Sequence, residues 1–275
     1  MLEQELIDKC LNAAKEMRID AVRATYSVGN TGAHIGGTLS MIEIMSVLYL
    51  AVMNIDKTNL ASKNRDRFIL SKGHGVLAQY TALKQIGILT DEELMTFKKT
   101  GTRLYAHPSI NREIGIEFSS GSLGQGISLA VGVALALKKQ NNDAKVYVLL
   151  GDGECNEGSV WEALASASHF KLDNLCVIVD RNNLQYDGAT TDVMSMRLDK
   201  KFEAFGFSVT EVDGHDIAAL YRAFKNSSTL PKAVIADTVK GKGISFMENN
   251  PIWHNGKLSE KQYQAAMEEL GIVLE

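Results

Sequence analysis

The chain has 275 residues, 45% of them hydrophobic and 23% charged, which is typical of a soluble globular protein with one large domain or two small ones. Its net charge of −4 gives no basic footprint for nucleic acid or for an anionic membrane surface. Three widely spaced cysteines and an acidic amino terminus exclude a disulfide framework and a secretion signal, so we expect a cytoplasmic protein.

The first half of the chain is predicted to be mainly helical. Apolar side chains at helical spacing predict helices over residues 2–28 and 40–53. A buried strand over 68–70 precedes a glycine-flanked turn and a helix over 76–85, and Thr90 with three acidic residues resembles a capped helix start. The run 127–139 is almost wholly apolar, which predicts a helix buried on most sides but too short an apolar stretch to span a membrane.

Strands and helices alternate in the second half. Strands are predicted over 145–150, 175–179, 207–212 and 233–238, with helices over 157–170, 197–205 and 216–226 between them and an amphipathic helix over 259–270. This alternation is typical of parallel βαβ units. We therefore predict an α/β fold with an open, mainly parallel sheet and helices on both faces, whose ligands bind beyond the carboxyl ends of the strands.

Polar residues follow two neighbouring predicted strands. Asp152 lies in the turn GDG (residues 151–153), and Asn182 follows the next strand after 29 intervening residues, which fit one turn, one helix and one strand. A carboxylate and a carboxamide suit a hard divalent cation that also binds phosphates, and Gly153 allows a phosphate to approach the backbone. Taken alone, GDG is more often an ordinary strand-to-helix turn.

The whole run GDGECNEGSVWEALASASHFKLDNLCVIVDRNNLQYDG, residues 151–188, resembles the thiamine diphosphate motif of transketolases, which reads GDG, EG, a helix, NL, a strand and DxN. The resemblance extends over nearly all of the chain. It implies one diphosphate-binding (PP-type) domain over residues 1–275 with a helical amino-terminal segment. It also implies transfer of a two-carbon ketol unit from a ketose, phosphorylated in the family's usual reaction, to an aldose. The cofactors would be thiamine diphosphate and Mg²⁺, for which Ca²⁺ or Mn²⁺ could substitute.

The same resemblance assigns roles to residues within this run. Mg²⁺ would be held by Asp152, by Asn182 and by the main-chain carbonyl of Leu184. Gly153 and Asn182 would contact the diphosphate. Glu157 matches the family's glutamate that lies at the dimer interface near the cofactor, and it counts among the catalytic residues.

Four of the six histidines lie in glycine-rich or loop segments, namely His34, His74, His107 and His254. A single histidine is more often structural, but a group of four suits ketol transfer, because imidazoles can hold hydroxyl groups and move protons near neutral pH. By the resemblance, His74 and His254 contact the diphosphate, while His34, His107 and His254 line the substrate channel. His34 departs from the relatives that read GHPG, since it lies in AHIG.

A second glycine-rich segment, SGSLGQG at residues 120–126, precedes the apolar helix. Its glycines could simply permit close packing, but it matches the family's GPLGQG loop, which contacts the aminopyrimidine and thiazolium of the cofactor. Gly121, Ser122 and Leu123 carry over, with Ser122 in place of a common proline.

Three further features are interpreted as structural or solvated. His169 lies on the helix that follows GDG, and His215 lies in a DGH turn. Lys240 and Lys242 belong to KGKG after the last strand, where one of them could contact a phosphate, although a solvated turn is the more typical interpretation.

The activating glutamate of transketolases belongs to a pyrimidine-binding domain that follows this one, and the chain has no room for that domain or for the third. The resemblance therefore implies one subunit of a split transketolase, whose partner is a subunit with the pyrimidine-binding and carboxyl-terminal sections, in an α₂β₂ heterotetramer. Sugars or sugar phosphates would be the substrates. No nucleic acid or membrane partner is expected.

Other interpretations stay open. The α subunit of a 2-oxo acid dehydrogenase E1 component and a deoxyxylulose-phosphate synthase bind the same cofactor, and a non-catalytic regulatory subunit could keep the fold. The EG and WEA segments (157–158 and 161–163) and the SGSLGQG loop favour transketolase. Intact Asp152, Asn182, His74 and His254 argue against a decayed site. The sequence leaves the sugar open, from pentose phosphate pathway ketoses to branched or sulfonated ones.

Overall fold

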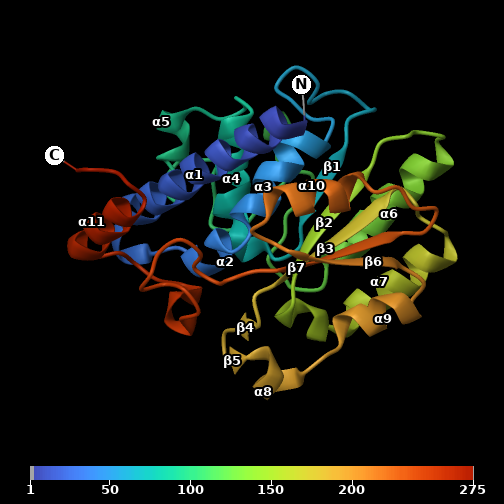
Figure 1. Cartoon of the computed structure of the whole chain (residues 1–275). Coiled ribbons are helices and arrows are strands. Elements are labelled where there is room, and N and C mark those ends of the chain that lie inside the picture. The colour runs from blue at the N-terminus through green and yellow to red at the C-terminus, as the bar shows by residue number, and fades with distance from the viewer. Residues whose placement is uncertain (1–2, 275) are drawn as a thin grey trace.

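In the computed structural model, which describes residues 3–274, the first half of the chain is mainly helical (Figure 1). Its elements are α1 (Glu3–Ser27), α2 (Ile35–Leu39), α3 (Ile42–Val47) with a π-helical extension over Leu48–Val52, β1 (Arg67–Leu70), α4 (Val76–Gln85) and α5 (Asp91–Leu94). The predicted elements are confirmed, and residue 2 of the first helix lies outside the described residues. Thr90 caps α5 as expected, since its side chain accepts a 3.1 Å hydrogen bond from the backbone N–H of Glu93.

The second half alternates strands and helices, as predicted. The elements are α6 (Gly126–Lys139), β2 (Val146–Gly151), α7 (Gly158–His169), β3 (Leu175–Arg181), α9 (Leu198–Ala204), β6 (Ser208–Asp213), α10 (Ile217–Lys225), β7 (Lys232–Asp237) and α11 (Glu260–Glu269). A small hairpin of β4 (Leu184–Gln185) and β5 (Gly188–Ala189), followed by α8 (Thr190–Met194), was not predicted. It extends from the carboxyl edge of the sheet (Figure 1).

Five strands form one parallel sheet in the order β1-β2-β3-β7-β6. Gly151 at the end of β2 pairs with Asp180 on β3, and Arg181 pairs with Asp237 at the end of β7. The carboxyl ends of the three central strands therefore lie at one level. This register brings the GDG turn next to the segment that carries Asn182.

Alternation along the strands divides the core into two layers. One set of strand side chains packs with α1, α3, α4 and α10, and includes Phe68, Leu70, Tyr147, Leu149 and Ile178. The intervening residues pack with α6, α7 and α9, and include Ile69, Val146, Val148, Leu150 and Val177. Figure 1 shows helices on both faces of the sheet. Both faces are buried, as the continuous apolar runs of parallel strands require. The predicted α/β fold class is confirmed.

The expected burial of α6 is wrong for the residues that the structure describes. Ile127, Ala130, Ala134 and Leu137 are buried on one side of the helix, against the sheet and α7. The opposite side, with Ser128, Gly132 and Ala136, is exposed. The apolar composition predicts burial, but it does not say whether this chain or another one provides the covering surface.

None of the helices within residues 3–274 is long and apolar enough to cross a membrane.

Candidate active site

A cavity of about 350 Å³ lies at the carboxyl edge of the sheet, beyond the ends of β1, β2, β3 and β7. Parallel α/β sheets place their ligand sites there. Among the predicted site residues, the cavity is lined by His74, Leu123, Asp152, Gly153, Glu157, Asn182, Leu184 and His254. Lys72, Glu154 and Lys240 also line it, and sequence reasoning assigned no role to the first two.

Asp152 is held at the end of β2 by two backbone donors. Its carboxylate accepts hydrogen bonds from the N–H of Gly153 (2.8 Å) and from the N–H of Asn183 (2.6 Å). Burial, together with the charge of Asp180, raises the pKa of Asp152 to about 6. A buried carboxylate with a raised pKa favours a nearby cation, because the cation would stabilise its ionised form.

The other two predicted metal ligands, Asn182 and Leu184, lie close together directly after β3. Asn182 Oδ1 accepts a 3.2 Å hydrogen bond from the N–H of Leu184, and the Leu184 carbonyl accepts one from Lys240 Nζ at 3.3 Å. Among the described residues, no group of three or more His, Cys, Asp or Glu could hold a metal ion. The donors that these residues do present are carboxylate, amide and main-chain carbonyl oxygens, which is the kind of donor that Mg²⁺ takes.

The four histidines singled out by sequence are brought together. The ring of His34 lies 5.5 Å, centroid to centroid, from each of the rings of His74, His107 and His254, and His74 lies 5.2 Å from His254. They come from segments far apart in the sequence. Tyr186 in the unpredicted hairpin contacts His254 edge-on at 5.5 Å.

These imidazoles are neutral at pH 7. Burial lowers the pKa of His34 and of His254 to about 4, with further contributions from His107 and Lys240 respectively, and burial with Lys72 lowers that of His74 to about 2. Neutral imidazoles both donate and accept hydrogen bonds, which suits a site for several sugar hydroxyls.

Lys240 is buried in the cavity wall, so the interpretation of KGKG as a solvated turn is wrong for this residue. Its Nζ lies 3.2 Å from His254 Nδ1. Because an ammonium group only donates, His254 accepts at Nδ1 and carries its hydrogen on Nε2. Burial and the charge of Lys72 lower the pKa of Lys240 to about 8.

Lys242, in contrast, is half-buried and pairs with Glu248 at 3.6 Å. The glycines of KGKG suggested a surface turn. The position of this segment directly after β7, at the ligand-binding edge of the sheet, was the better indication that Lys240 belongs to the site.

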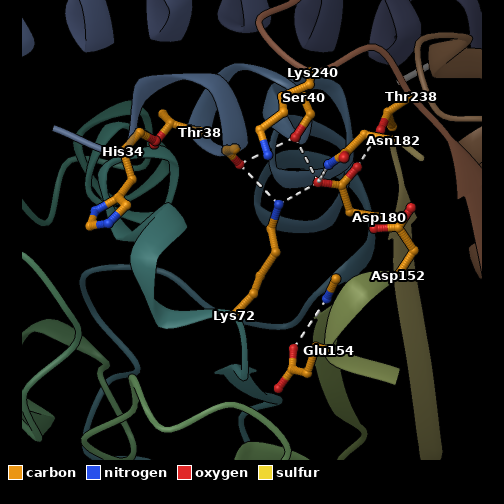
Figure 2. A network of polar contacts seen from close by, with 12 residues as sticks. His34, Thr38, Ser40, Lys72, Asp152, Glu154, Asp180, Asn182, Thr238 and Lys240 are labelled. Atoms are coloured by element: carbon orange, nitrogen blue, oxygen red, sulfur yellow. Dashed lines mark hydrogen bonds and ion pairs between the residues drawn. The ribbon is translucent and has the colours of Figure 1, made fainter. Parts of the chain in front are cut away.

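Lys72 is a second buried cation that sequence reasoning missed. It follows β1, donates to the Gly37 carbonyl (2.9 Å) and forms an ion pair with Asp180 (Figure 2). Its segment, SKGHG, was noted only for His74. Its position directly after a buried strand, at the predicted ligand-binding edge of the sheet, could have identified this lysine as a candidate site residue.

Glu154 connects the two glycine-rich segments of the site. Its carboxylate accepts hydrogen bonds from the N–H of Gly124 (2.8 Å), the N–H of Gly151 (3.1 Å) and the hydroxyl of Ser71. A Cβ on Gly124 would lie 2.7 Å from Cβ of Glu157, and its φ of +79° also favours glycine. The SGSLGQG loop is thus fixed against the GDG turn.

The exposed part of that loop lies farther from the cavity. Gly121 approaches the ring of His107, since a Cβ on it would lie 3.2 Å from His107 Cδ2. Gly121 and Ser122 are not buried, and neither belongs to the lining of the cavity, whereas Leu123 does. Glu157 lines the cavity from its exposed rim, just before α7.

The other two histidines lie apart from this cluster. His215 bridges Glu43 Oε2 (3.0 Å) and the N–H of Val239 (2.9 Å), which ties α3 to the segment after β7. His169 is exposed at the end of α7, next to the ring of Phe170. Both positions are in keeping with the structural interpretation.

Comparison with known proteins gives one consistent family. Residues 7–274 match the family described as transketolase, thiamine diphosphate binding domain. One subunit of the apulose-4-phosphate transketolase of Actinobacillus succinogenes is 41% identical over 262 residues, which cover 93% of this chain and 95% of that protein. The 6-deoxy-6-sulfo-D-fructose transketolase subunit SqwG of a Clostridium species is 40% identical over 248 residues, covering 88% and 90%.

A solved transketolase structure, that of Campylobacter jejuni, superposes with a TM-score of 0.85 at 31% identity and covers 98% of this chain. The match covers 43% of the Campylobacter chain. The chain thus spans less than half of a full-length transketolase but nearly all of the two subunits above.

Proposed function

Because this chain belongs to the transketolase family, in its thiamine diphosphate-binding domain, we propose that it is the metal- and diphosphate-binding subunit of a two-chain transketolase. The reaction is transfer of a two-carbon ketol unit from a ketose to an aldose. The observation that carries the proposal is the cavity where Asp152, Asn182 and two buried lysines meet His74 and His254, with the rings of His34 and His107 adjoining them.

The cavity fits a divalent cation with a diphosphate. Asp152, the amide oxygen of Asn182 and the carbonyl of Leu184 would hold Mg²⁺, or Ca²⁺ or Mn²⁺ in its place. Gly153 supports this fit, because a Cβ there would lie 2.6 Å from Gln185 Oε1 and crowd the space next to the turn. Lys240 places positive charge on the wall, which compensates the phosphates, whereas the charge of Lys72 is balanced by its ion pair with Asp180.

The neutral histidines are assigned to the substrate and to the cofactor. His74 and His254 line the cavity, and we place them against the diphosphate end. His34, His107 and the Nε2–H of His254 would hold hydroxyl groups of the sugar and donate or accept the proton at its reacting oxygen. Glu157 at the rim, with Gly121, Ser122 and Leu123, would meet the aminopyrimidine half of the cofactor.

When bound, thiamine diphosphate supplies the two-carbon carrier chemistry, which no amino-acid side chain provides. This chain orients the cofactor and excludes water from its diphosphate end. We propose that the activating glutamate comes from a partner subunit with the pyrimidine-binding domain, in an α₂β₂ assembly in the cytoplasm. The relatives named as subunits support a partner.

We propose a ketose with an anionic group at its far end as the donor. The two relatives act, by their names, on a sugar phosphate and on a sulfonated sugar. The histidine cluster provides contacts for hydroxyl groups, which all ketoses share, so the partner would read the anionic end.

The test is reconstitution. The full chain alone is expected to bind thiamine diphosphate weakly and to show no ketol transfer, because it grips only one end of the cofactor. Mixed with a subunit that carries the pyrimidine-binding domain, it should form a stable complex and turn over a ketose donor with an aldose acceptor. Full ketol transfer by this chain without a second protein would contradict the two-chain proposal.

A further inference from the structure

A buried polar network adjoins the proposed metal site and includes its ligand Asn182 (Figure 2). It consists of side chains from four segments that meet at the carboxyl edge of the sheet, namely Ser40, Lys72, Asp180, Asn182 and Thr238, and we call it the Asp180 network. Asp180 is fully buried and Lys72 is 1% exposed. Neither belongs to the ligand set proposed above.

Asp180 is the acceptor of every side-chain bond in this network. Its Oδ2 accepts from Lys72 Nζ, from Ser40 Oγ (2.6 Å) and from Asn182 Nδ2 (3.3 Å), and its Oδ1 accepts from Thr238 Oγ1. All four of these neighbours present an N–H or O–H donor to the buried carboxylate, and one of them is the ammonium group of Lys72, which forms an ion pair with it. The carboxylate is therefore an acceptor towards each of its partners.

This has a direct consequence for Asn182. An amide has an NH₂ end that donates and an oxygen end that accepts, and a carboxylate oxygen that already accepts from a lysine ammonium can receive only the NH₂ end. The oxygen of Asn182 must then lie on the other side, where it accepts from the N–H of Leu184. That side carries the loop of Asp152, whose carboxylate is bonded by the N–H of Asn183.

A divalent cation binds the oxygen of an amide and not its NH₂ group. We infer that Asp180 is a positioning residue, which fixes the amide of Asn182 with its oxygen towards the cation, while Lys72 compensates the buried charge that this requires. The inference rests on the proposed function. It also explains why the ion pair of Lys72 and Asp180 is buried next to the metal ligands, which the ligand set alone does not explain.

Burial of the pair for stability alone is a weaker explanation. Replacing both members of a buried ion pair with apolar groups of similar size is often neutral or stabilising. A carboxylate at position 180, in contrast, is specifically suited to holding an amide in one orientation. Partners that orient metal ligands typically contribute roughly 10- to 100-fold to metal affinity.

The test compares two double variants of the full chain. Lys72→Met/Asp180→Leu removes the charge and the acceptor, whereas Lys72→Met/Asp180→Asn removes the charge but keeps an oxygen that can accept from Asn182. Mn²⁺ affinity is measured by electron paramagnetic resonance in excess thiamine diphosphate. We expect roughly 10- to 100-fold weaker binding for the leucine variant and a change of less than about threefold for the asparagine variant.

Two additional variants complete the design. Arg65→Met/Glu117→Gln removes another buried ion pair (2.5 Å), whose arginine precedes β1 at the opposite edge of the sheet, and should keep wild-type affinity. Adding Asn182→Asp to the leucine variant presents oxygen on both sides and should restore Mn²⁺ binding. If the leucine variant does not fold, Lys72→Met/Asp180→Ala replaces it.

The outcomes separate this inference from the proposed function. If the folded leucine and asparagine variants bind Mn²⁺ with equal affinity, whether strong or weak, the positioning role of Asp180 is overturned. Mn²⁺ binding by the wild type would still support the proposed metal site in that case. Absence of Mn²⁺ binding by the wild type, with Asp152→Ala unchanged from it, overturns the proposed function and this inference with it.

Discussion

The two ends of the cavity differ in how completely this chain builds them. At the strand end, Asp152 is 8% exposed and Lys240 is 2% exposed, and both are held by hydrogen bonds within the chain. At the loop end, large apolar side chains face outwards, among them Tyr105 at 52% and Ile110 at 50% exposure. The first end is preorganised, whereas the second has the composition of a surface that another protein covers.

The cause lies in the backbone. The geometry of the strand end is set by the register of β2, β3 and β7. Residues that directly follow these strands are held in place by the hydrogen bonds between the strands. The loop end comes from residues 101–125, which contain a 3₁₀ turn and one isolated bridge, between Asn111 and Ile116. Ser120 anchors this segment by donating to the Leu70 carbonyl at 2.6 Å. Substitutions at the two ends should therefore behave differently.

The largest effect is expected at the strand end. Asp152→Ala should abolish Mg²⁺-dependent binding of thiamine diphosphate, with a loss of more than about 100-fold, which exceeds the loss of an outer-shell partner. The diphosphate would lose its bridging cation while the sheet remains intact. Calorimetric titration of the folded variant measures it. Asp237→Ala, which removes an exposed carboxylate at the same edge, is the control, and unchanged cofactor affinity in Asp152→Ala would exclude the metal assignment.

The strand end is also where sequence analysis was most successful. Alternating strand and helix patterns predicted the parallel sheet, and such a sheet then requires Asp152 and Asn182 to share an edge. Lys72 was missed, and Lys240 was interpreted as part of a solvated turn because of the glycines next to it. Only the tertiary structure shows that the cavity wall buries it.

The failures concern segments whose structure depends on contacts far along the chain. Strands β4 and β5 have two residues each, too few for an alternation pattern, and their hairpin is placed by contacts such as that of Tyr186 with His254. The burial of α6 was overestimated because an apolar helix face does not reveal which chain covers it. The histidine cluster could be suspected from sequence, but not its 5.5 Å spacing.

A smaller but still large effect is expected where the two ends meet, at the histidines. In the reconstituted complex, His34→Ala and His107→Ala should each lower the rate of ketol transfer by about 10²–10³-fold, as for loss of one transition-state hydrogen-bond donor. His169→Ala should leave the rate near that of the wild type, because His169 is exposed at the end of α7. Steady-state kinetics with one ketose donor and one aldose acceptor measures these rates. Full activity of the His34/His107 double variant would place the substrate elsewhere.

The preorganised end should also make the stability of the chain depend on pH. The pKa of His34 and of His254 is lowered to about 4 and that of His74 to about 2, from an ordinary value of 6.5. The unfolded chain therefore binds protons below pH 6.5 that the folded chain does not. The stabilisation from neutral histidines is complete above pH 6.5 and is lost as the pH falls towards 4 and below.

Denaturant titrations between about pH 7 and pH 5 measure this dependence. His74→Asn should flatten the decrease in the free energy of unfolding, whereas His169→Asn, which changes an exposed side chain, should keep the wild-type slope. A slope that His74→Asn leaves unaltered would show that this histidine is as accessible to protons in the folded chain as in the unfolded one.

The smallest effect is expected at the loop end, and it should depend on the partner. Leu123 is half-buried and lines the cavity, and Leu123→Ala would remove an apolar contact of about 1 kcal/mol, equivalent to roughly fivefold in cofactor affinity. That loss should appear only in the reconstituted complex, because the isolated chain leaves this end of the cofactor in water. In the isolated chain the variant should bind thiamine diphosphate within about twofold of the wild type.

Leu11→Ala, an equally conservative truncation of an exposed leucine on α1, is the matched control and should change neither affinity. Isothermal titration of both variants, alone and with the partner, gives four affinities and their wild-type references. An equal loss for Leu123→Ala with and without the partner would mean that this chain alone already encloses the cofactor at both ends. The difference between a preorganised strand end and an open loop end would then be one of exposure only, because both ends would bind the cofactor without help from another chain.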